Sequence, residues 1–589
     1  MGRLHGPGQK YRLRDLDRDA LRMLYSHIRP HGGVLLFAGA IMLAVTCLNL
    51  LPPYLTKIAV DRFISRGNSS GLAMVSLSLI ALVACSWAGA YWRGYLAGRC
   101  GQRIVYAIRD DLLRHILRQP VAFHQRERVG QITSRLTGDI DALSEIVSSS
   151  VISLFNDFIS VAGVVSVMLF MSWRLTLVTL CAVPVLIVSM RYLGKKMRDA
   201  HRQIRQEIAH VNTGVEQGVS GIRVIQSLSR ERFTMEQFEA LSMRNMKANM
   251  RAGILFAAVF PTMTITNMLG VVLVLGYGSL LAHSGAISIG TIVAFLGYVN
   301  HLFGPLRELS LVYGTLQASA AALDRVWEYM KVQPSILFPA KSQEPSGGFR
   351  GAIAFSNVSF AYDDTPILKN ISFVAQPHET IAIVGPTGAG KTTIAGLLAR
   401  LYDVGSGAIT IDGIDIRNIA EQRLRSLVAF VPQDLFLFAD TIRENIRYGK
   451  PDADDLMVER IAQVAQAHPF IAELSMGYET EIGERGVRIS AGQRQLIALA
   501  RALLSEPRIL VLDEATANVD PYTESLILKP IDTVRRQRTL IIIAHRYTTL
   551  SKADRVIVLQ EGRIESEGPH EMVRNTSKVY RSLFQRQWA

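Results

Sequence analysis

Charged residues are scarce in this chain, and their shortage excludes an ordinary soluble protein. Only 19% of the 589 residues are charged, whereas 49% are hydrophobic, and the mean hydropathy is +0.21. We therefore expect part of the chain to lie in lipid. At this length the chain is also too long for one compact domain, so we expect at least one further domain outside the membrane.

Cysteines are equally few, and their spacing does not fit a metal site. All four lie in or beside apolar segments, which predicts free thiols packed as small hydrophobic groups. They are Cys47, Cys85, Cys100 and Cys181. The N-terminus lacks a secretory signal with a cleavage site, and its first residues are basic and polar. This start predicts a cytoplasmic N-terminus.

The chain has an excess of positive charge, with a formal net charge of +14 and a pI near 9.6. Nucleic-acid binding is one interpretation of that excess. The other is a membrane protein, because cytoplasmic loops of membrane proteins collect Arg and Lys. The basic residues fall mostly between apolar segments, which favours the membrane interpretation and no nucleic-acid partner.

Six apolar segments have the length needed to cross a bilayer, and they predict an all-α transmembrane domain over residues 1–330. We place the spans near Gly33–Leu55, Leu72–Leu96, Val151–Ser172, Leu175–Leu193, Ile254–Ala282 and Ile287–Leu306. Before them, residues 16–29 have apolar side chains at helical spacing and end before Pro30. This amphipathic helix is predicted to lie in the membrane interface, the alternative being an ordinary surface helix.

The links between the spans are unequal in length and charge. Two of them, about Arg99–Ser150 and Gly194–Gly253, are long and rich in Arg, which places both in the cytoplasm together with the two ends of the domain. Both continue the helical periodicity of their spans, so we expect long cytoplasmic helical extensions. Turns are expected near Phe123–Gly130 and Asn212–Gly221, either as mechanical contact points or as plain solvated hairpins.

Prolines and glycines mark residues 331–350 as a linker. Residues 351–589 then alternate short strands and helices, which predicts an α/β domain. Within it, Gly385–Thr392 fits the phosphate-binding pattern G-x-x-x-x-G-K-[ST] at every fixed position. A buried strand, Thr380–Val384, is predicted before the loop and a helix, Thr393–Leu401, after it. Strand, loop and helix in this order make a chance match a poor explanation.

The residues of this loop suit a nucleotide. Its glycines allow successive backbone N–H groups to point at phosphate oxygens, and the helix N-terminus adds partial positive charge. Lys391 reaches the β- and γ-phosphates, and the Thr392 hydroxyl suits Mg²⁺. The predicted contact residues are Gly385, Pro386, Thr387, Gly388, Ala389, Gly390, Lys391, Thr392 and Thr393.

An aliphatic strand, Ile509–Leu512, ends in Asp513 and Glu514. Beside a phosphate loop, Asp513 is suited to ordering Mg²⁺ ligands and Glu514 to polarising the attacking water. Acids after a strand are also common turn residues, so the assignment depends on the phosphate loop.

Four further positions each have an ordinary structural explanation beside the functional one. The run Ser490, Ala491, Gly492, Gln493 opens a predicted helix and offers N–H groups to phosphate, or is only a helix cap. His545 follows a strand, where its ring suits the γ-phosphate, or it is a structural histidine. Tyr362 is suited to stacking on adenine, or is an edge aromatic. Gln433 follows a short strand and suits Mg²⁺ or water, or is a turn residue.

With these motifs the whole chain resembles half-transporters of the exporter fold in the ATP-binding cassette (ABC) family. The resemblance implies an adenine-stacking role for Tyr362, a Walker A loop at Gly385–Thr392 and a Q-loop glutamine at Gln433. It further implies a signature motif at Ile489–Gln493 that closes over ATP held by the partner subunit. The remaining implied roles are Asp513 as the Walker B aspartate, Glu514 as the catalytic glutamate, Asp520 as the D-loop aspartate and His545 as the switch histidine.

The same resemblance assigns Thr480–Gly486 to a segment that contacts the cytoplasmic loops, and it places coupling helices at Phe123–Gly130 and Asn212–Gly221. Three positions depart from the family pattern. Ala491 replaces the first glycine of the signature, and we expect function to survive because alanine still offers its N–H at a negative φ. Asn518 in the D-loop and Tyr547 after the switch histidine leave open a non-identical partner subunit.

The resemblance implies an ATPase coupled to transmembrane transport, with ATP and Mg²⁺ at a site shared between two half-transporters. A homodimer and a heterodimer are equally compatible with the sequence. The leading prediction is export or flipping of an amphipathic, lipid-like or drug-like substrate in a bacterial inner or plasma membrane. The alternatives are an importer on the same fold, for example of a metal chelate, a soluble cassette ATPase and an inactive regulatory subunit.

One acid stands inside the third predicted span. Asp157, beside Asn156, is predicted to face a water-accessible cavity and to bear on substrate choice, because intramembrane charges are costly. The alternative is an acid that is simply in water or paired with an Arg near the cytoplasmic side.

Overall fold

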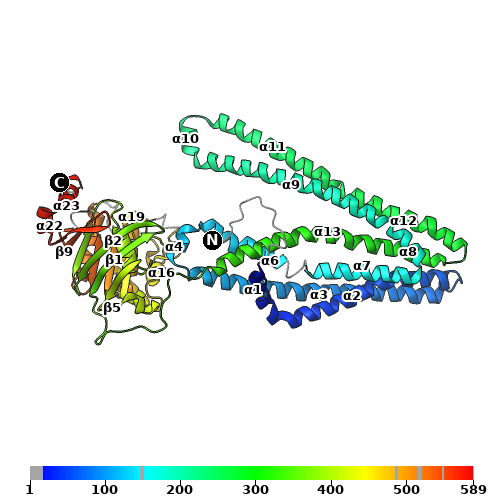
Figure 1. Ribbon diagram of the computed structural model, residues 1–589, viewed down its shortest axis with the longest axis horizontal. Helices are drawn as coiled ribbons and strands as arrows, with labels where there is room; N and C mark the ends of the chain where they lie inside the picture. The colour runs from blue at the N-terminus through cyan, green and yellow to red at the C-terminus, as the bar shows by residue number, and fades with distance from the viewer. Residues whose placement is uncertain are drawn as a thin grey trace. The chain divides into compact units, whose positions relative to one another are not determined.

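The computed structural model describes residues 17–145, 151–483, 489–513, 521–544, 546 and 550–587. The chain forms two compact units, which are considered separately (Figure 1). One contains Met1–Leu117 and Val129–Val332, and the other contains Arg118–Arg128 and Gln333–Ala589. A short stretch from the first third of the sequence therefore belongs with the C-terminal part of the chain.

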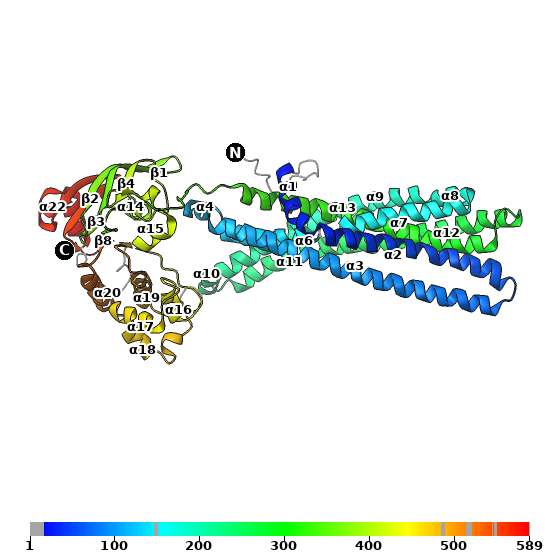
Figure 2. The ribbon, with the colours of Figure 1, turned by 90° about the horizontal axis from the view of Figure 1, so that it is seen from below.

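The first unit consists of helices. Its elements are α1 (Arg18–Ile28), α2 (Gly32–Ile58), η3 (Ala59–Ile64), α3 (Ser69–Leu117), α5 (Val129–Ser134), η4 (Arg135–Asp139), α6 (Ile140–Glu145), α7 (Val151–Met171), α8 (Trp173–Leu180), α9 (Ala182–Ser220), α10 (Ile222–Ser227), α11 (Glu231–Ala257), α12 (Val259–His283) and α13 (Ile289–Lys331). The long helices run lengthwise beside one another in both views (Figure 2).

Among the described residues, five helical segments are long and apolar enough to cross a membrane. A sixth apolar stretch, Ile289–Pro305 at the start of α13, is shorter. The apolar runs end without ending their helices: α3 continues to Leu117 and α13 to Lys331. Two of the spans are interrupted, at Cys181 between α8 and α9 and at Ala258 between α11 and α12.

The turn expected at Asn212–Gly221 begins only at the last residue of that range and continues beyond it, so the prediction places it too early in the chain. Helix α9 continues to Ser220, and the chain bends at Gly221 and again at Leu228–Arg230. Gly214 and Gly218 lie inside α9, because glycine costs an established helix only about 1 kcal/mol and does not end it. The other expected turn contains the short helix α4 (Val121–Arg126).

The core of the helical unit lies where α7, α8, α9, α12 and α13 meet. Phe295 and Tyr298 of α13 are fully buried there, together with Met168 of α7. The Tyr298 hydroxyl donates a hydrogen bond of 2.9 Å to the Leu50 carbonyl of α2. This bond satisfies the one polar atom of a buried tyrosine and joins α2 to the core.

Asp157 does not face water, contrary to both the cavity prediction and its solvated alternative. Its side chain is 3% exposed in α7, with the Asn156 amide 3.5 Å away. The Asn156 carbonyl oxygen also lies 3.1 Å from the Thr46 hydroxyl of α2 and 3.4 Å from an Arg93 nitrogen of α3. Asp157 thus belongs to a polar cluster between three helices.

The cysteines are free thiols, as the sequence predicts. Only Cys100 is buried, however, whereas Cys47, Cys85 and Cys181 are exposed on the helical unit. The expectation that all four pack as small hydrophobic groups is therefore correct for Cys100 alone.

The second unit contains two β-sheets. One is antiparallel with strand order β2-β1-β4-β5, formed by β1 (Ile353–Tyr362), β2 (Thr365–Ala375), β4 (Ser406–Ile411) and β5 (Ile414–Asp415). The other has the order β10-β9-β3-β8-β7-β6, formed by β3 (Thr380–Val384), β6 (Val428–Val431), β7 (Ile509–Asp513), β8 (Thr539–Ile543), β9 (Arg555–Gln560) and β10 (Arg563–Gly568). In this second sheet all pairs except β9 with β10 are parallel.

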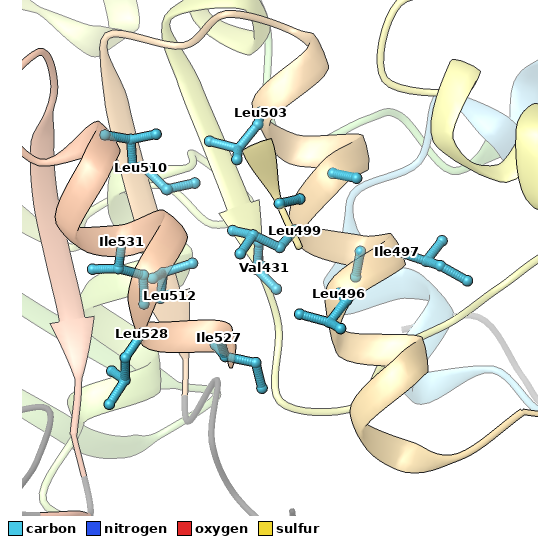
Figure 3. Close-up of a cluster of buried hydrophobic side chains, with 14 of the residues drawn as sticks. Val431, Leu496, Ile497, Leu499, Leu503, Leu510, Leu512, Ile527, Leu528 and Ile531 are labelled. Atoms are coloured by element: carbon cyan, nitrogen blue, oxygen red, sulfur yellow. The ribbon is translucent and has the colours of Figure 1, made fainter. Parts of the chain in front are cut away.

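Helices cover these sheets, which completes the α/β architecture expected from the sequence. They are α14 (Lys391–Leu398), η6 (Ile416–Asn418), α15 (Glu421–Leu427), α16 (Ile442–Arg447), α17 (Asp455–Val464), α18 (His468–Glu473), η7 (Gly477–Glu479), α19 (Ala491–Leu504), α20 (Pro521–Val534), α22 (His570–Thr576) and α23 (Lys578–Gln587). Figure 3 shows Leu496 and Leu499 of α19 and Ile531 of α20 in one cluster with Leu512 of β7. The fully buried strands β3, β7 and β8 lie at the centre of the unit, as parallel strands covered on both faces do.

Candidate nucleotide-binding site

The candidate site is an edge of the parallel sheet. Strands β3, β8, β7 and β6 are neighbours and run in one direction, so the segments that follow them emerge at the same edge. The described ones begin at Gly385, Ala544 and Pro432. In open α/β sheets, ligands bind outside this carboxyl edge.

The loop from Gly385 to Gly390 joins β3 to α14. Gly385 has no room for a side chain, because an added Cβ would lie 2.3 Å from the Leu559 carbonyl oxygen. Gly390 has φ +99°, and its added Cβ would lie 2.5 Å from Leu368. These contacts explain why the loop needs glycine at both ends, while Pro386, Thr387 and Gly388 between them are exposed. Ala389 is buried and closes the turn by donating its N–H to the Pro386 carbonyl at 3.2 Å.

Lys391, the first residue of α14, folds back over the loop. Its ammonium group donates hydrogen bonds to the carbonyl oxygens of Gly385, at 2.9 Å, and Pro386, at 3.1 Å. The side chain is only 7% exposed, so the charge is held at the centre of the loop rather than in solvent. This position suits a cation that meets phosphate oxygens within the loop.

Oxygen-bearing side chains lie along the same edge. Asp513 is the last residue of β7 and is 1% exposed, whereas Thr392 and Gln433 are exposed. Thr393 is buried, with its hydroxyl 3.4 Å from that of Tyr362. A buried carboxylate and an exposed hydroxyl are hard oxygen donors of the kind that Mg²⁺ prefers, and Mg²⁺ commonly takes its other ligands from phosphates and water.

Tyr362, at the end of β1, is 36% exposed and belongs to an aromatic cluster. Its ring centroid lies 4.9 Å from that of Phe360 and 5.2 Å from that of Tyr402, both in edge-on geometry. Edge-on packing by neighbours leaves an aromatic face available to a further planar group. Tyr362 lies beside the N-terminal turn of α14, and its adenine-stacking role stays a prediction.

The sequence gives no hint that Tyr402 joins this cluster, and our prediction missed it. The Tyr402 hydroxyl donates a hydrogen bond of 2.8 Å to the Gln125 side chain of α4. Burial raises the pKa of Tyr402, which keeps the hydroxyl protonated as a donor. Arg126 of α4 also forms an ion pair with Asp363, the residue after Tyr362. Only the fold reveals these contacts, since the partners lie more than 200 residues apart.

The segment Ser490–Gln493 begins α19. Ser490 is its N-cap: the hydroxyl accepts the Gln493 N–H at 3.2 Å, and the Gln493 side chain accepts the Ser490 N–H at 2.9 Å. This reciprocal pair is a capping box. Ala491 is exposed at the first position of the helix, and Gly492 behind it is buried. The cap leaves a helix N-terminus, with its partial positive charge, open to an anion.

Several predicted residues lie outside the described part of the chain. They are Glu514, Asp520 and His545, together with Asn518, Tyr547 and the Glu484–Gly486 end of the segment that starts at Thr480. Of that segment, Thr480 accepts the Ile442 N–H at 3.1 Å, and Ile482 donates to the Asp440 carbonyl at 2.9 Å.

Comparison with known protein families agrees with this geometry. The family model described as "ABC transporter transmembrane region" matches residues 35–306, and the one described as "ABC transporter" matches residues 368–517. The first match covers the apolar helices, and the second covers the phosphate loop with strands β3, β6 and β7 of its sheet. The chain belongs to the ABC transporters.

Individual relatives of this ABC transporter match over most of its length. It is 32% identical to an ATP-dependent lipid A-core flippase of Syntrophus aciditrophicus, over 97% of this chain and 95% of the relative. A fatty acid ABC transporter ATP-binding/permease protein of Mycobacterium tuberculosis is 36% identical over 80% of this chain and 74% of its own. A solved bacterial Atm1-family ABC exporter with ATP bound superposes with a TM-score of 0.77 at 26% identity, over 95% of this chain and 99% of that one.

The family resemblance seen in the sequence is therefore confirmed, as is the order of a helical transmembrane domain before an α/β nucleotide-binding domain. The chain is an exporter-type ABC transporter that resides in the membrane and hydrolyses ATP. A soluble cassette ATPase is excluded by the match to the transmembrane region.

Proposed function

We propose that the transporter uses ATP hydrolysis to export or flip an amphipathic, lipid-like or drug-like substrate, and that it works as a dimer of half-transporters. One observation carries the proposal: within the described residues, a single chain joins membrane-spanning helices to an ATPase unit with one phosphate loop, at Gly385–Lys391, and one segment that resembles the signature motif, at the start of α19. One chain thus supplies half of each shared ATP site and one set of spans. The partner is a second copy or a similar half-transporter.

The substrate class is inferred from relatives whose printed functions concern lipids. They are a lipid A-core flippase and a fatty acid transporter. The superposing solved protein is an exporter. None of these favours import, so the importer alternative lacks support.

In the proposed reaction, Tyr362 stacks on adenine and the loop N–H groups with Lys391 hold the phosphates. Glu514 takes a proton from water as the water oxygen bonds to the γ-phosphorus, and the bond from that phosphorus to the bridging oxygen of ADP breaks. His545 steadies the γ-phosphate, and Asp520 contacts the partner subunit. The segment Ser490–Gln493 of the partner subunit closes over the same ATP.

The donor set at the sheet edge fits Mg²⁺. Asp513, Thr392 and Gln433 would hold it through oxygen atoms, and the bound ion would neutralise charge on the phosphates. Asp513 is buried at the end of a fully buried strand, so its carboxylate is fixed in place for such a role. Gln433 follows β6, the edge strand next to β7. This position at the edge of the sheet also suits a residue that links the site to the rest of the unit.

We further propose that the N-terminus and the ATPase unit are cytoplasmic, in a bacterial inner or plasma membrane. The support is the concentration of Arg and Lys in the long helical links, which six spans would put on the same side as both ends of the membrane domain.

The test is Glu514→Gln in purified, reconstituted protein. We expect ATP binding to persist while turnover decreases by roughly 10²–10⁴-fold, because a positioned base is lost. Uptake of a labelled lipid into inside-out vesicles, compared with right-side-out vesicles, then fixes the direction. Near-normal ATPase of the variant would contradict the catalytic assignment, and substrate uptake only into right-side-out vesicles would contradict export.

A further inference from the structure

A cavity of about 420 Å³ lies between α9 and α11, far along the sequence from the nucleotide site. Lys196, Asp199, Gln203 and Gln206 of α9 line it at helical spacing, and Arg202 joins them. Arg251 of α11 lines the other side. Residues three and four apart on a helix share a face, so these side chains converge on one hollow.

Small residues bring the two helices close at this level. Ala200 of α9 and Ala248 and Ala252 of α11 are buried, with at most 9% exposure. Alanines at a crossing let backbones approach closely. The long polar side chains are consequently displaced to the rim, where they surround the hollow instead of filling it.

Among the described residues, the cations of this cavity have no carboxylate partner. Within the described residues, Lys196, Arg202 and Arg251 form no ion pair with any carboxylate, although Asp199 lies in the same lining. The nearest partner of Lys196 is the face of Tyr192, with the ammonium 4.6 Å from the ring centroid. Lys196, Arg202 and Arg251 are exposed, whereas the half-buried Arg135 and Arg325 are paired with Asp139.

The cavity also lies where the apolar surface of both helices ends. On α9, Val188 and Tyr192 are 67% and 63% exposed just before Lys196. On the α11 side, Ile254 and Phe256 are 69% and 60% exposed just after Arg251. Leu255 contributes an apolar wall to the cavity itself. The cavity thus has exposed apolar side chains on one side and positive charge without carboxylate partners on the other. This combination matches an amphiphile with an anionic headgroup.

We propose that this cavity binds the phosphate headgroup of an anionic lipid from the surrounding leaflet. Two guanidinium groups match phosphate oxygens in fork geometry, and the amides of Gln203 and Gln206 add neutral donors. Basic pockets between membrane helices hold such headgroups. In this proposal, the exposed apolar side chains next to the cavity face the acyl chains of the same lipid. The proposal depends on membrane residence, and it holds for any transported substrate and for either direction of transport.

The test is native mass spectrometry of the intact protein in detergent with phosphatidylglycerol or phosphatidylcholine. We expect wild type to bind phosphatidylglycerol more tightly. R202Q/R251Q should bind it roughly 10–30-fold more weakly, since each basic residue near a membrane surface contributes on the order of 1 kcal/mol. The matched control is R205Q/R244Q, which removes the same charge from exposed positions on the same two helices outside the cavity. The control should bind like wild type.

A substitution expected to strengthen binding distinguishes a lost binding site from a damaged fold. Asp199→Asn removes the carboxylate of the lining and should tighten phosphatidylglycerol binding several-fold, which damage to the fold would not do. Glycerol 3-phosphate serves as a lipid-free probe and should bind at least tenfold more weakly than the lipid. Equal losses in both double variants, no loss in R202Q/R251Q, or equally tight binding of glycerol 3-phosphate would each overturn the proposal.

Discussion

Asp61 and Gly290 are joined by a hydrogen bond between the turn after α2 and the start of α13, although 229 residues separate them in sequence. One Asp61 carboxylate oxygen accepts the Gly290 N–H at 2.9 Å, and the other accepts the Ser288 hydroxyl at 2.6 Å. Both donors belong to the N-terminal turn of α13, where negative charge is favourable. Asp61 lies in the π-helical turn η3 that ends α2, so this contact ties the beginning of α13 to the end of α2.

Gly290→Ala should weaken this junction. An added Cβ would lie 2.6 Å from both Asp61 and the Lys57 carbonyl oxygen, which leaves no space without moving α2. We expect a loss of about 1–3 kcal/mol, typical of overpacking, seen as a lower Tm in detergent. The control is Gly276→Ala on α12, whose added Cβ would have no neighbour within 4 Å. An unchanged Tm for Gly290→Ala would show that the contact does not hold the helices.

A second junction depends on pH. Asp139 is 7% exposed and accepts hydrogen bonds from Arg325, at 2.5 and 3.1 Å, and from Arg135, at 2.6 Å. Burial alone would raise the pKa of Asp139, but the two arginines outweigh it and lower the pKa. A lowered native pKa means that the stabilisation is present above the unfolded value, about 3.9, and is lost as pH falls through the native value.

Asp139→Asn should therefore lower stability at neutral pH by about 1–3 kcal/mol, since charge-assisted hydrogen bonds to a buried group are lost. The difference from wild type should shrink below about pH 4, which thermal unfolding across pH 3–7 measures. Asp141→Asn is the matched control, because its ion pair with Arg109 is solvent-exposed and should contribute less than about 1 kcal/mol. Equal effects of the two substitutions would contradict a special role for Asp139.

Tyr402→Phe tests the link between α4 and the aromatic cluster. The ring remains beside Phe360 and Tyr362, so we expect ATP affinity to change less than about twofold, while the hydrogen bond to Gln125 is lost. Stimulation of ATPase by transported lipid should decrease, and Gln125→Leu should give the same decrease. Full stimulation in both variants would show that the bond is only structural.

Ala491→Gly examines the departure from the family signature. Ala491 is the first residue of α19, with a backbone that needs no glycine, and its N–H is available without substitution. We expect steady-state ATPase to stay within about threefold of wild type, because a first-turn Ala to Gly change costs less than about 1 kcal/mol. A tenfold gain in activity would show that the alanine restrains the site.

The sequence predicted the strand, loop and helix around Gly385–Lys391 better than the packing of the helical unit, and the reason is locality. Gly385 and Lys391 are fixed by a loop whose strand and helix adjoin it in sequence, so the pattern alone identifies them. The packing around Asp157 is set by α2 and α3, which no local pattern encodes, and its burial was therefore missed. The end of α9 was misplaced because Asn212 and Gly218 are tolerated inside a long helix that tertiary contacts stabilise.

Helix α4 packs with residues that follow it by almost half the chain. During synthesis, α4 is therefore made long before the residues against which it packs. Gln125 leaves the ribosome 277 residues before its partner Tyr402. At about 5–20 residues per second, the α4 segment waits roughly 15–55 s for its binding surface to be made. The α4 segment therefore stays undocked while α5 to α13 are made, so a translational pause after residue 330 would lengthen that wait without changing any contact in the finished protein.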